Sequence, residues 1–367
     1  MMHWKDWRNR LVSDPRFQSF AARFLLTRPV AAAQARKAFD LAAGFVYSQV
    51  LLACVELRLF ELLRDGPRPL ADLAQAADLP PEAMERLLLA ANSLALTEAR
   101  GPGVFGLGMA GAALLGNPGA LAMVVHHKLV YRDLADPVAL LRHGPSAQGL
   151  ARFWAYAREE DRRAIPDEDV AAYSTLMDQS QSLVRRDLLD FYPMGQVRHM
   201  IDVGGGEGGF CLEAAKRYPQ LHATCLDLPA VARRAQARFE REGLAGRISA
   251  KGCDFKAEAI PQGADLITLV RVLHDHDDAP ALALLRSIRA GLPQGGKLLI
   301  AEPMADAPGA EPMGDAYFGF YLLAMGSGRP RSSSEIRDML RAAGFAEAQA
   351  LRTPRPLLVS LIEASAI

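Results

Sequence analysis

The glycine-rich run I-D-V-G-G-G-E-G-G-F could hold a ligand against bare backbone, because glycine permits tight turns and a close approach to the main chain. Its spacing suits two cofactors. Gly204, Gly206 and Gly209 satisfy the G-x-G-x-x-G pattern of dinucleotide-binding loops. Gly204, Gly206 and Gly208 equally suit a loop that binds S-adenosylmethionine (SAM). Asp227, about 20 residues further on, would place an acid on the ribose of either cofactor.

Polar clusters that follow later strands distinguish the two cofactors. Short apolar runs predict five strands, at residues 198–203, 223–226, 247–252, 264–270 and 297–301. Asp254 and Phe255 follow the third strand, His274 follows the fourth, and Glu302 follows the fifth. Open α/β sheets bind ligands at the carboxyl ends of their strands. We expect an acid and an aromatic ring on an adenine, and a His at the reacting end of the cofactor.

Five motifs, D-V-G-G-G-E-G, L-D-L-P, G-C-D-F, R-V-L-H-D and A-E-P, occur in this order. Together they resemble the SAM-dependent O-methyltransferases of the plant caffeate and bacterial antibiotic or pigment type, from about Ala38 to the C-terminus. A closer resemblance is to the carotenoid branch of purple bacteria, the hydroxyneurosporene or demethylspheroidene O-methyltransferases. It rests on W-R-N-R-L-V-S-D-P-R-F-Q, G-F-V-Y-S-Q-V-L-L-A-C-V and M-G-S-G-R-P-R-S.

This resemblance implies an α/β fold. A Rossmann-like class I methyltransferase domain, with a doubly wound, mostly parallel seven-stranded sheet, would follow an all-helical, winged-helix dimerisation domain. It implies SAM as cofactor, S-adenosyl-L-homocysteine as product, and no metal. The expected cofactor-binding residues are Asp202, Gly204, Gly206, Asp227, Leu228, Asp254, Phe255 and Arg271. The residues expected in the acceptor pocket are Tyr173, Met177, Gln181 and Tyr321.

His274 and Glu302 are the expected catalytic pair. An aliphatic hydroxyl is too weakly acidic to be ionised beforehand, so His274 would remove its proton in concert with methyl transfer. Glu302 would orient the imidazole and stabilise its protonated form. The resembling family often has a second supporting Glu before a helix that ends in A-A-G-F. That place falls near Pro330 here, so Glu302 is expected to act alone.

The polar residues just after the expected base have simpler interpretations. Asp275, Asp277 and Asp278 look like a metal cluster, but the first turn of a helix also attracts acids, and that interpretation is favoured. His276 is expected at the surface. Asp202 is expected to hold the glycine loop more than to touch the cofactor.

Length and charge fit a two-domain enzyme without a polyanionic partner. The chain has 367 residues, and its 42 Lys and Arg residues balance 42 Asp and Glu residues. We expect an N-terminal extension (1–37), a winged-helix-like dimerisation domain (38–110), a helical connector that roofs the acceptor pocket (111–190) and a SAM-binding catalytic domain (191–367).

The winged-helix pattern also occurs in DNA-binding regulators. Its second helix, however, carries Glu82 and Glu85 beside a leucine-rich face. A helix that lies among phosphates should be basic, so homodimerisation is favoured and no nucleic-acid partner is expected.

The extension combines aromatic and basic residues, beginning with Trp4, Lys5, Trp7 and Arg8. Such a segment can lie in a membrane interface or pack on a partner subunit, and the sequence favours neither. The apolar stretches at 41–55 and 108–125 are too short or too interrupted to span a bilayer. We expect a cytoplasmic protein, with peripheral contact to the inner or photosynthetic membrane if the extension binds lipid.

The sequence therefore predicts methyl transfer from SAM to the tertiary hydroxyl of an acyclic carotenoid. An O-methyltransferase acting on a phenolic or polyketide hydroxyl is the first alternative. A NAD-dependent oxidoreductase and a catalytically inactive winged-helix binding protein are remoter ones, and the retained His274 and Glu302 oppose the last.

Overall fold

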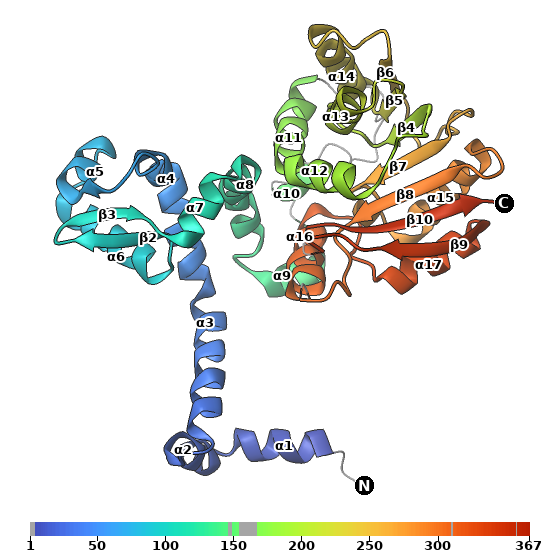
Figure 1. The fold of residues 1–367 in the computed structure, drawn as a ribbon. Coiled ribbons are helices and arrows are strands. Elements are labelled where there is room, and N and C mark those ends of the chain that lie inside the picture. The colour runs from blue at the N-terminus through green and yellow to red at the C-terminus, as the bar shows by residue number, and fades with distance from the viewer. Residues whose placement is uncertain (1–3, 146–148, 154–166, 310, 357) are drawn as a thin grey trace. The chain divides into compact units, whose positions relative to one another are not determined.

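The structure is a computed structural model that describes residues 4–145, 149–153, 167–309, 311–356 and 358–367 (Figure 1). The chain divides into two compact units, Met1–Gly116 and Asn117–Ile367. Part of the predicted connector, 111–190, lies outside the described residues.

The first unit combines helices with a small antiparallel sheet. Its helices are α1 (Trp4–Ser13), α2 (Pro15–Arg23), α3 (Arg28–Glu56), α4 (Leu59–Leu62), α5 (Leu70–Ala76), α6 (Pro81–Ser93) and α7 (Met109–Leu115). Its strands are β1 (Arg68–Pro69), β2 (Thr97–Gly101) and β3 (Val104–Leu107), in the order β1-β3-β2. Met84, Leu88 and Ala91 recur at helical spacing on α6 and are fully buried. The winged-helix pattern predicted from the sequence is present.

The N-terminal helices differ from the expected pattern. The extension holds two helices because Asp14 ends the first and caps the second, accepting a hydrogen bond from the Arg16 amide at 2.8 Å. Helix α3 has 29 residues, and its length and composition suffice for a membrane crossing. The 41–55 stretch is therefore part of a longer helix than the sequence suggested. Among the described residues, the helices Met109–Leu115 and Pro118–Asp133 also pass that test when they are taken together as one bent pair.

The second unit begins with helices and continues into a seven-stranded sheet. The helices are α8 (Pro118–Asp133), α9 (Pro137–His143), α10 (Leu150–Phe153), α11 (Asp167–Ser180) and α12 (Ser182–Phe191). The strands are β4 (His199–Val203), β5 (His222–Asp227), β6 (Ile248–Gly252), β7 (Leu266–Val270), β8 (Lys297–Glu302), β9 (Phe345–Leu351) and β10 (Ser360–Ala366). Their order is β6-β5-β4-β7-β8-β10-β9, and β10 runs antiparallel to β8 and β9. All five strands predicted from the sequence are present.

Helices cover both faces of this sheet (Figure 1). On one face lie α12, α13 (Gly209–Arg217) and α14 (Pro229–Arg241), with Leu188, Phe210 and Phe239 in their core. On the other lie α15 (Asp278–Gly291) and α17 (Ser333–Ala342), with Leu285 and Leu340 buried. Strands buried on both faces read as continuous apolar runs, which is why the sequence predicted them. Strands β4, β5, β7 and β8 run parallel to one another, so their carboxyl ends lie at the same edge of the sheet.

Candidate active site

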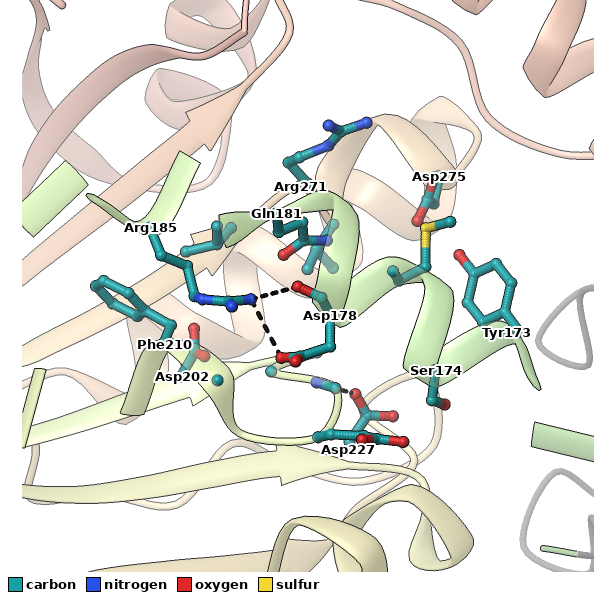
Figure 2. Close-up of a pocket in the computed structure, with 18 of the residues that line it drawn as sticks. Tyr173, Ser174, Asp178, Gln181, Arg185, Asp202, Phe210, Asp227, Arg271 and Asp275 are labelled. Carbon is teal, nitrogen blue, oxygen red and sulfur yellow. Dashed lines mark hydrogen bonds and ion pairs between the residues drawn. The ribbon is translucent and has the colours of Figure 1, made fainter. Parts of the chain in front are cut away.

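The glycine loop after β4 is held by the acid at the end of β5. Gly206 is in the left-handed region at φ 58°, and its amide donates to Asp227 Oδ2 at 2.8 Å (Figure 2). The amide of Leu228 donates to Asp227 Oδ1 at 2.7 Å. Asp227 is 3% exposed, so the loop and this carboxylate form one fixed rim of the site.

An ion-pair network connects the helices around the glycine loop. Arg185 of α12 donates to the backbone oxygen of Asp178 at 2.7 Å and to its carboxylate at 3.1 Å (Figure 2). Arg238 of α14 pairs with the same carboxylate at 3.1 Å. A Cβ at position 209 would lie 2.2 Å from Asp178 Oδ1, so Gly209 makes this close packing feasible. The sequence analysis did not identify Asp178 or Arg185, whose only signal is opposite charge on two neighbouring helices.

A pocket lies between the glycine loop and α11. Its lining residues are Tyr173, Ser174, Met177, Asp178, Gln181, Arg185, Asp202, Gly204, Gly205, Gly206, Glu207, Gly209, Phe210, Asp227, Phe255, Val270, Arg271, Val272, Asp275 and His276. Nine residues predicted from the sequence are thereby brought together. As far as the described residues define this lining, Leu228, Asp254, His274, Glu302 and Tyr321 lie outside it. Leu228 still supports Asp227 through its amide, and Asp254 accepts from the Lys256 amide at 3.1 Å.

The chemistry of this pocket fits a ligand with a polar, nucleoside-like end. Ser174 Oγ lines it, is buried, and has no hydrogen-bond partner in the part of the chain that the structure describes. A buried hydroxyl without a partner costs free energy, which a polar ligand atom would recover. Asp227 offers a carboxylate on one side, and Phe255 offers an aromatic ring.

Asp202 lies near the end of β4, just before the glycine loop, and is bound to the neighbouring strand β7. The Thr268 hydroxyl donates to Asp202 Oδ1 at 2.7 Å, and the residue is 1% exposed. Burial raises the pKa of Asp202 to about 7. This contact is with β7, so the expectation that Asp202 mainly holds the loop stays a prediction.

The His274 side chain is fixed by Glu302. His274 lies in a 3-10 turn, Leu273–Asp275, just after β7, and its Nδ1 hydrogen-bonds to Glu302 Oε2. The other oxygen, Oε1, accepts from the backbone amides of Val272 at 2.9 Å and Leu273 at 2.6 Å. One buried carboxylate therefore sets both the turn and the orientation of the ring, as the sequence analysis expected for the ring.

Asp275 lies beside the second ring nitrogen of His274. Its Oδ1 is 3.2 Å from His274 Nε2, and it lines the pocket. Burial lowers the pKa of His274, but the carboxylates of Asp275 and Glu302 outweigh burial and raise it above its usual value. Burial raises the pKa of Asp275 to about 6. The imidazole is thus placed between two carboxylates, so the structure favours its protonated form.

Two expectations about the neighbouring residues need correction. His276 is buried, not exposed: it is 6% exposed, lines the pocket and makes an edge contact with Phe255, since the 3-10 turn folds it inward. Asp275 faces His274 and does not act as a helix-terminal acid. Asp277 and Asp278 do lie at the start of α15, where Asp277 accepts from the Gly328 amide at 2.9 Å.

A buried arginine supports the same turn. Arg331, 2% exposed, donates to the backbone oxygens of Leu273 at 2.8 Å and His276 at 2.7 Å. It also pairs with Asp278 at 2.8 Å. Arg331 lies within M-G-S-G-R-P-R-S, one of the stretches on which the carotenoid-branch resemblance rests, but no supporting role was predicted for it.

An aromatic cluster from α8 and from the segment after β8 packs beside His274. Phe318, at the end of the π-helix Pro312–Phe318, makes an edge contact with His274 at 5.8 Å between ring centroids. The hydroxyl oxygen of Tyr321, in α16 (Gly319–Met325), is 2.9 Å from His126 Nε2. The hydroxyl oxygen of Tyr317 is 2.7 Å from His127 Nε2. Tyr321 therefore belongs to an apolar wall next to His274, together with Tyr173 of the pocket.

Comparison with known proteins identifies the family. The O-methyltransferase domain matches residues 131–346, and the O-methyltransferase dimerisation domain matches residues 39–117. The chain belongs to the O-methyltransferase family. Its predicted enzyme class and fold class are thereby confirmed, and the dimerisation domain supports assembly as a homodimer.

Particular relatives of this O-methyltransferase extend over nearly all of it. Demethylspheroidene O-methyltransferase of Cereibacter sphaeroides is 42% identical over 355 residues, 97% of this chain and 93% of that protein. The protein of the same name from Rhodobacter capsulatus is 41% identical, over 97% and 88%. The crystal structure of human N-acetylserotonin methyltransferase in complex with SAM superposes with a TM-score of 0.72 at 26% identity, over 90% of this chain and 97% of that chain.

The two acids predicted to bind cofactor should differ in importance for this methyltransferase. Asp227→Ala removes a buried ionised acceptor, which is worth about 1.5–3 kcal/mol, so SAM affinity should fall roughly 10- to 100-fold in calorimetry. Asp254→Ala should weaken binding much less, because Asp254 lies outside the pocket lining. Equal losses, or an unchanged affinity for Asp227→Ala, would contradict the assignment.

Removing Arg331 should loosen the turn that carries His274. Arg331→Met leaves two buried backbone oxygens without donors, which should lower the free energy of unfolding by about 1–3 kcal/mol. We also expect kcat to fall while SAM affinity stays near that of the wild type. Urea unfolding and steady-state kinetics measure both, with the exposed Arg337→Met as control. Full activity in a destabilised Arg331→Met enzyme would show that the turn does not need this support.

Proposed function

We propose that this O-methyltransferase transfers the methyl group of SAM to the tertiary hydroxyl of an acyclic carotenoid of the demethylspheroidene or hydroxyneurosporene type. The observation that carries the proposal is the His274–Glu302 pair, which lies between the glycine-loop pocket and an aromatic cluster. The two relatives named demethylspheroidene O-methyltransferase, at 42% and 41% identity, support the acceptor class.

SAM is the methyl donor. When bound, it supplies a methyl group on a sulfonium sulfur, and the rest of the molecule leaves as a neutral thioether. The residues proposed to hold it are Gly204 and Gly206 by their backbone, Asp227 at the ribose, and Phe255 at the adenine ring. Asp254 and Arg271 are kept as further cofactor contacts. Because the leaving group needs no proton, no acid is required on that side of the site.

His274 is proposed as the general base. Its Nδ1 faces Glu302, so Nε2, which lies 3.2 Å from Asp275 Oδ1 in this structure, is the nitrogen proposed to take the proton of the acceptor hydroxyl. Proton removal concerted with transfer makes a weak nucleophile adequate and is usually worth roughly 10²–10⁴-fold in rate. The imidazolium that results is stabilised by Glu302 on one side and by Asp275 on the other. The chemistry is proposed to be independent of metal.

The acceptor is proposed to lie along the aromatic cluster. Tyr173, Met177 and Gln181 line the pocket, and Tyr321 packs beside the base, so a polyene would meet mainly apolar side chains. A phenolic or polyketide hydroxyl is the second candidate, favoured by the likeness to N-acetylserotonin methyltransferase. Labelled SAM offered with a panel of acyclic carotenoids and phenols distinguishes them: label in the phenols alone would refute the carotenoid proposal.

We retain the four-part division into extension, dimerisation domain, connector and catalytic domain as a proposal. We further propose that the homodimer is cytoplasmic and meets its acceptor at the surface of the inner or photosynthetic membrane, because an acyclic carotenoid dissolves in lipid and not in water.

Removing the base should separate binding from turnover. His274→Ala should lower kcat by roughly 10²–10⁴-fold, because only the acceptor proton needs the imidazole. SAM affinity, set by the glycine loop and Asp227, should stay near the wild-type value in calorimetry. Glu302→Gln should lose less activity, since it keeps a hydrogen-bond partner but loses the charge. A near-normal rate for His274→Ala would refute the general-base role.

Asp275 should influence how kcat/KM changes with pH. Only neutral His274 accepts a proton, and its pKa is raised above 6.5, so kcat/KM should rise with pH to a plateau through a midpoint above 6.5. Asp275→Asn removes a carboxylate that stabilises the imidazolium, so the midpoint should move to lower pH. Rate profiles of the two enzymes measure this shift. A midpoint that stays put or moves to higher pH would contradict the proposed electrostatics.

A further inference from the structure

Residues 4–30, which we call the N-terminal arm, expose an unusual amount of apolar surface. The arm comprises α1, α2 and the start of α3. Its large exposed apolar residues, with their exposed fractions, are Trp4 (61%), Trp7 (57%), Val12 (51%), Phe20 (55%), Phe24 (43%), Leu25 (77%), Leu26 (77%) and Val30 (64%). Exposed apolar side chains that gather in one segment mark an interaction surface.

The apolar side chains form stripes on both short helices of the arm. On α1, Trp4, Trp7 and Leu11 recur at the i, i+3, i+7 spacing that places them on one face. On α2, the rings of Phe20 and Phe24 stack at 5.3 Å between centroids, with Phe17 at 6.5 Å from Phe20. At about 1.5 Å per residue each helix is far shorter than the roughly 30 Å of a bilayer's hydrocarbon core. They can lie in a lipid interface but cannot cross it.

The arm is strongly basic although the whole chain is neutral. It contains six Lys and Arg residues (Lys5, Arg8, Arg10, Arg16, Arg23 and Arg28) and two Asp residues (Asp6 and Asp14). The Arg8 guanidinium lies 5.1 Å over the Trp4 ring, so charge and aromatic surface are side by side. Aromatic anchors beside basic groups suit the headgroup region of an anionic lipid surface, where each cation adds to the attraction.

A second copy of the chain is the other occupant of such a surface. The family's dimerisation domain begins at residue 39, beyond the end of the arm. Two such arms brought together would also repel one another through their matching positive charge. Charge complementarity therefore favours lipid.

We propose that the N-terminal arm docks the enzyme on an anionic membrane surface, with the Trp and Phe stripes in the lipid interface and the basic residues on the headgroups. The inference builds on the proposed lipid-dissolved acceptor, but lipid binding and methyl transfer are measured separately. The docked arm would hold the enzyme where its acceptor is most concentrated.

The test is co-sedimentation of the full-length chain with lipid vesicles. Binding is expected to vesicles of equal parts phosphatidylcholine and phosphatidylglycerol, and to be much weaker to phosphatidylcholine alone. Arg8→Glu/Arg16→Glu/Arg23→Glu should weaken binding at least roughly 100-fold, at about fivefold or more for each charge. Trp4→Ala/Trp7→Ala/Phe20→Ala should weaken it with charge unchanged. The matched control, Arg286→Glu/Arg337→Glu/Arg341→Glu, changes exposed arginines outside the arm and should bind like the wild type.

Three measurements distinguish the possible outcomes: methylation, vesicle binding and sedimentation velocity. Methylation of detergent-dispersed carotenoid should be the same in both arm variants and the wild type; if no carotenoid is methylated, the acceptor assignment fails while lipid binding still stands. Equal vesicle binding by the arm variants and the wild type would overturn the arm proposal. The proposal would also be overturned if the arm variants were monomers in sedimentation velocity and the wild type did not bind anionic vesicles. The arm would then be a contact between subunits.

Discussion

The hydrogen bonds accepted by Glu302 are the interaction on which the site depends. This buried carboxylate accepts from two consecutive backbone amides, Val272 and Leu273, and from the His274 ring. A single carboxylate side chain therefore holds both the backbone of the turn and the imidazole ring. Leaving such a carboxylate without its partners inside the protein would be costly. The position of the His274 ring is thus coupled to the stability of the turn that carries it.

The parallel sheet makes this coupling feasible. Strands β7 and β8 are neighbours and run parallel, with Val270 opposite Ala301. Glu302 follows directly on Ala301, so it reaches the turn that starts three residues after Val270. On the cofactor side, ion pairs position the elements instead of strand pairing. Asp178 of α11 binds Arg185 and Arg238, and Glu207 of the glycine loop binds Arg234 at 2.6 Å. Helix α11 is thereby held against the glycine loop.

Sequence reasoning succeeded where a local pattern is sufficient. Continuous apolar runs located every predicted strand to within about two residues, and the polar residue after each strand fell at the same edge because parallel topology requires it. Helix α3 begins at Arg28, about ten residues before the predicted start of the dimerisation domain at 38, and Pro29 fits its first turn.

Contacts between distant segments could not be predicted in this way. Arg331 supports a turn 58 residues earlier, and nothing in the irregular segment before α17 indicates that it would be buried. His276 lies next to a surface-like run of acids, yet the 3-10 turn rotates it into the pocket against Phe255. The Asp178–Arg185 pair depends on two helices meeting at an angle that no periodicity encodes.

The most direct test of this account is the titration of His274 itself. NMR spectra of enzyme labelled with ¹³C at its histidines, assigned by comparison with His274→Asn, would follow the ring through the pH range. The account predicts a wild-type midpoint above 6.5, and a lower midpoint in Glu302→Gln, because the charge that stabilises the imidazolium is lost. The same midpoint in both enzymes would show that Glu302 does not set the basicity of His274, and would contradict the central claim.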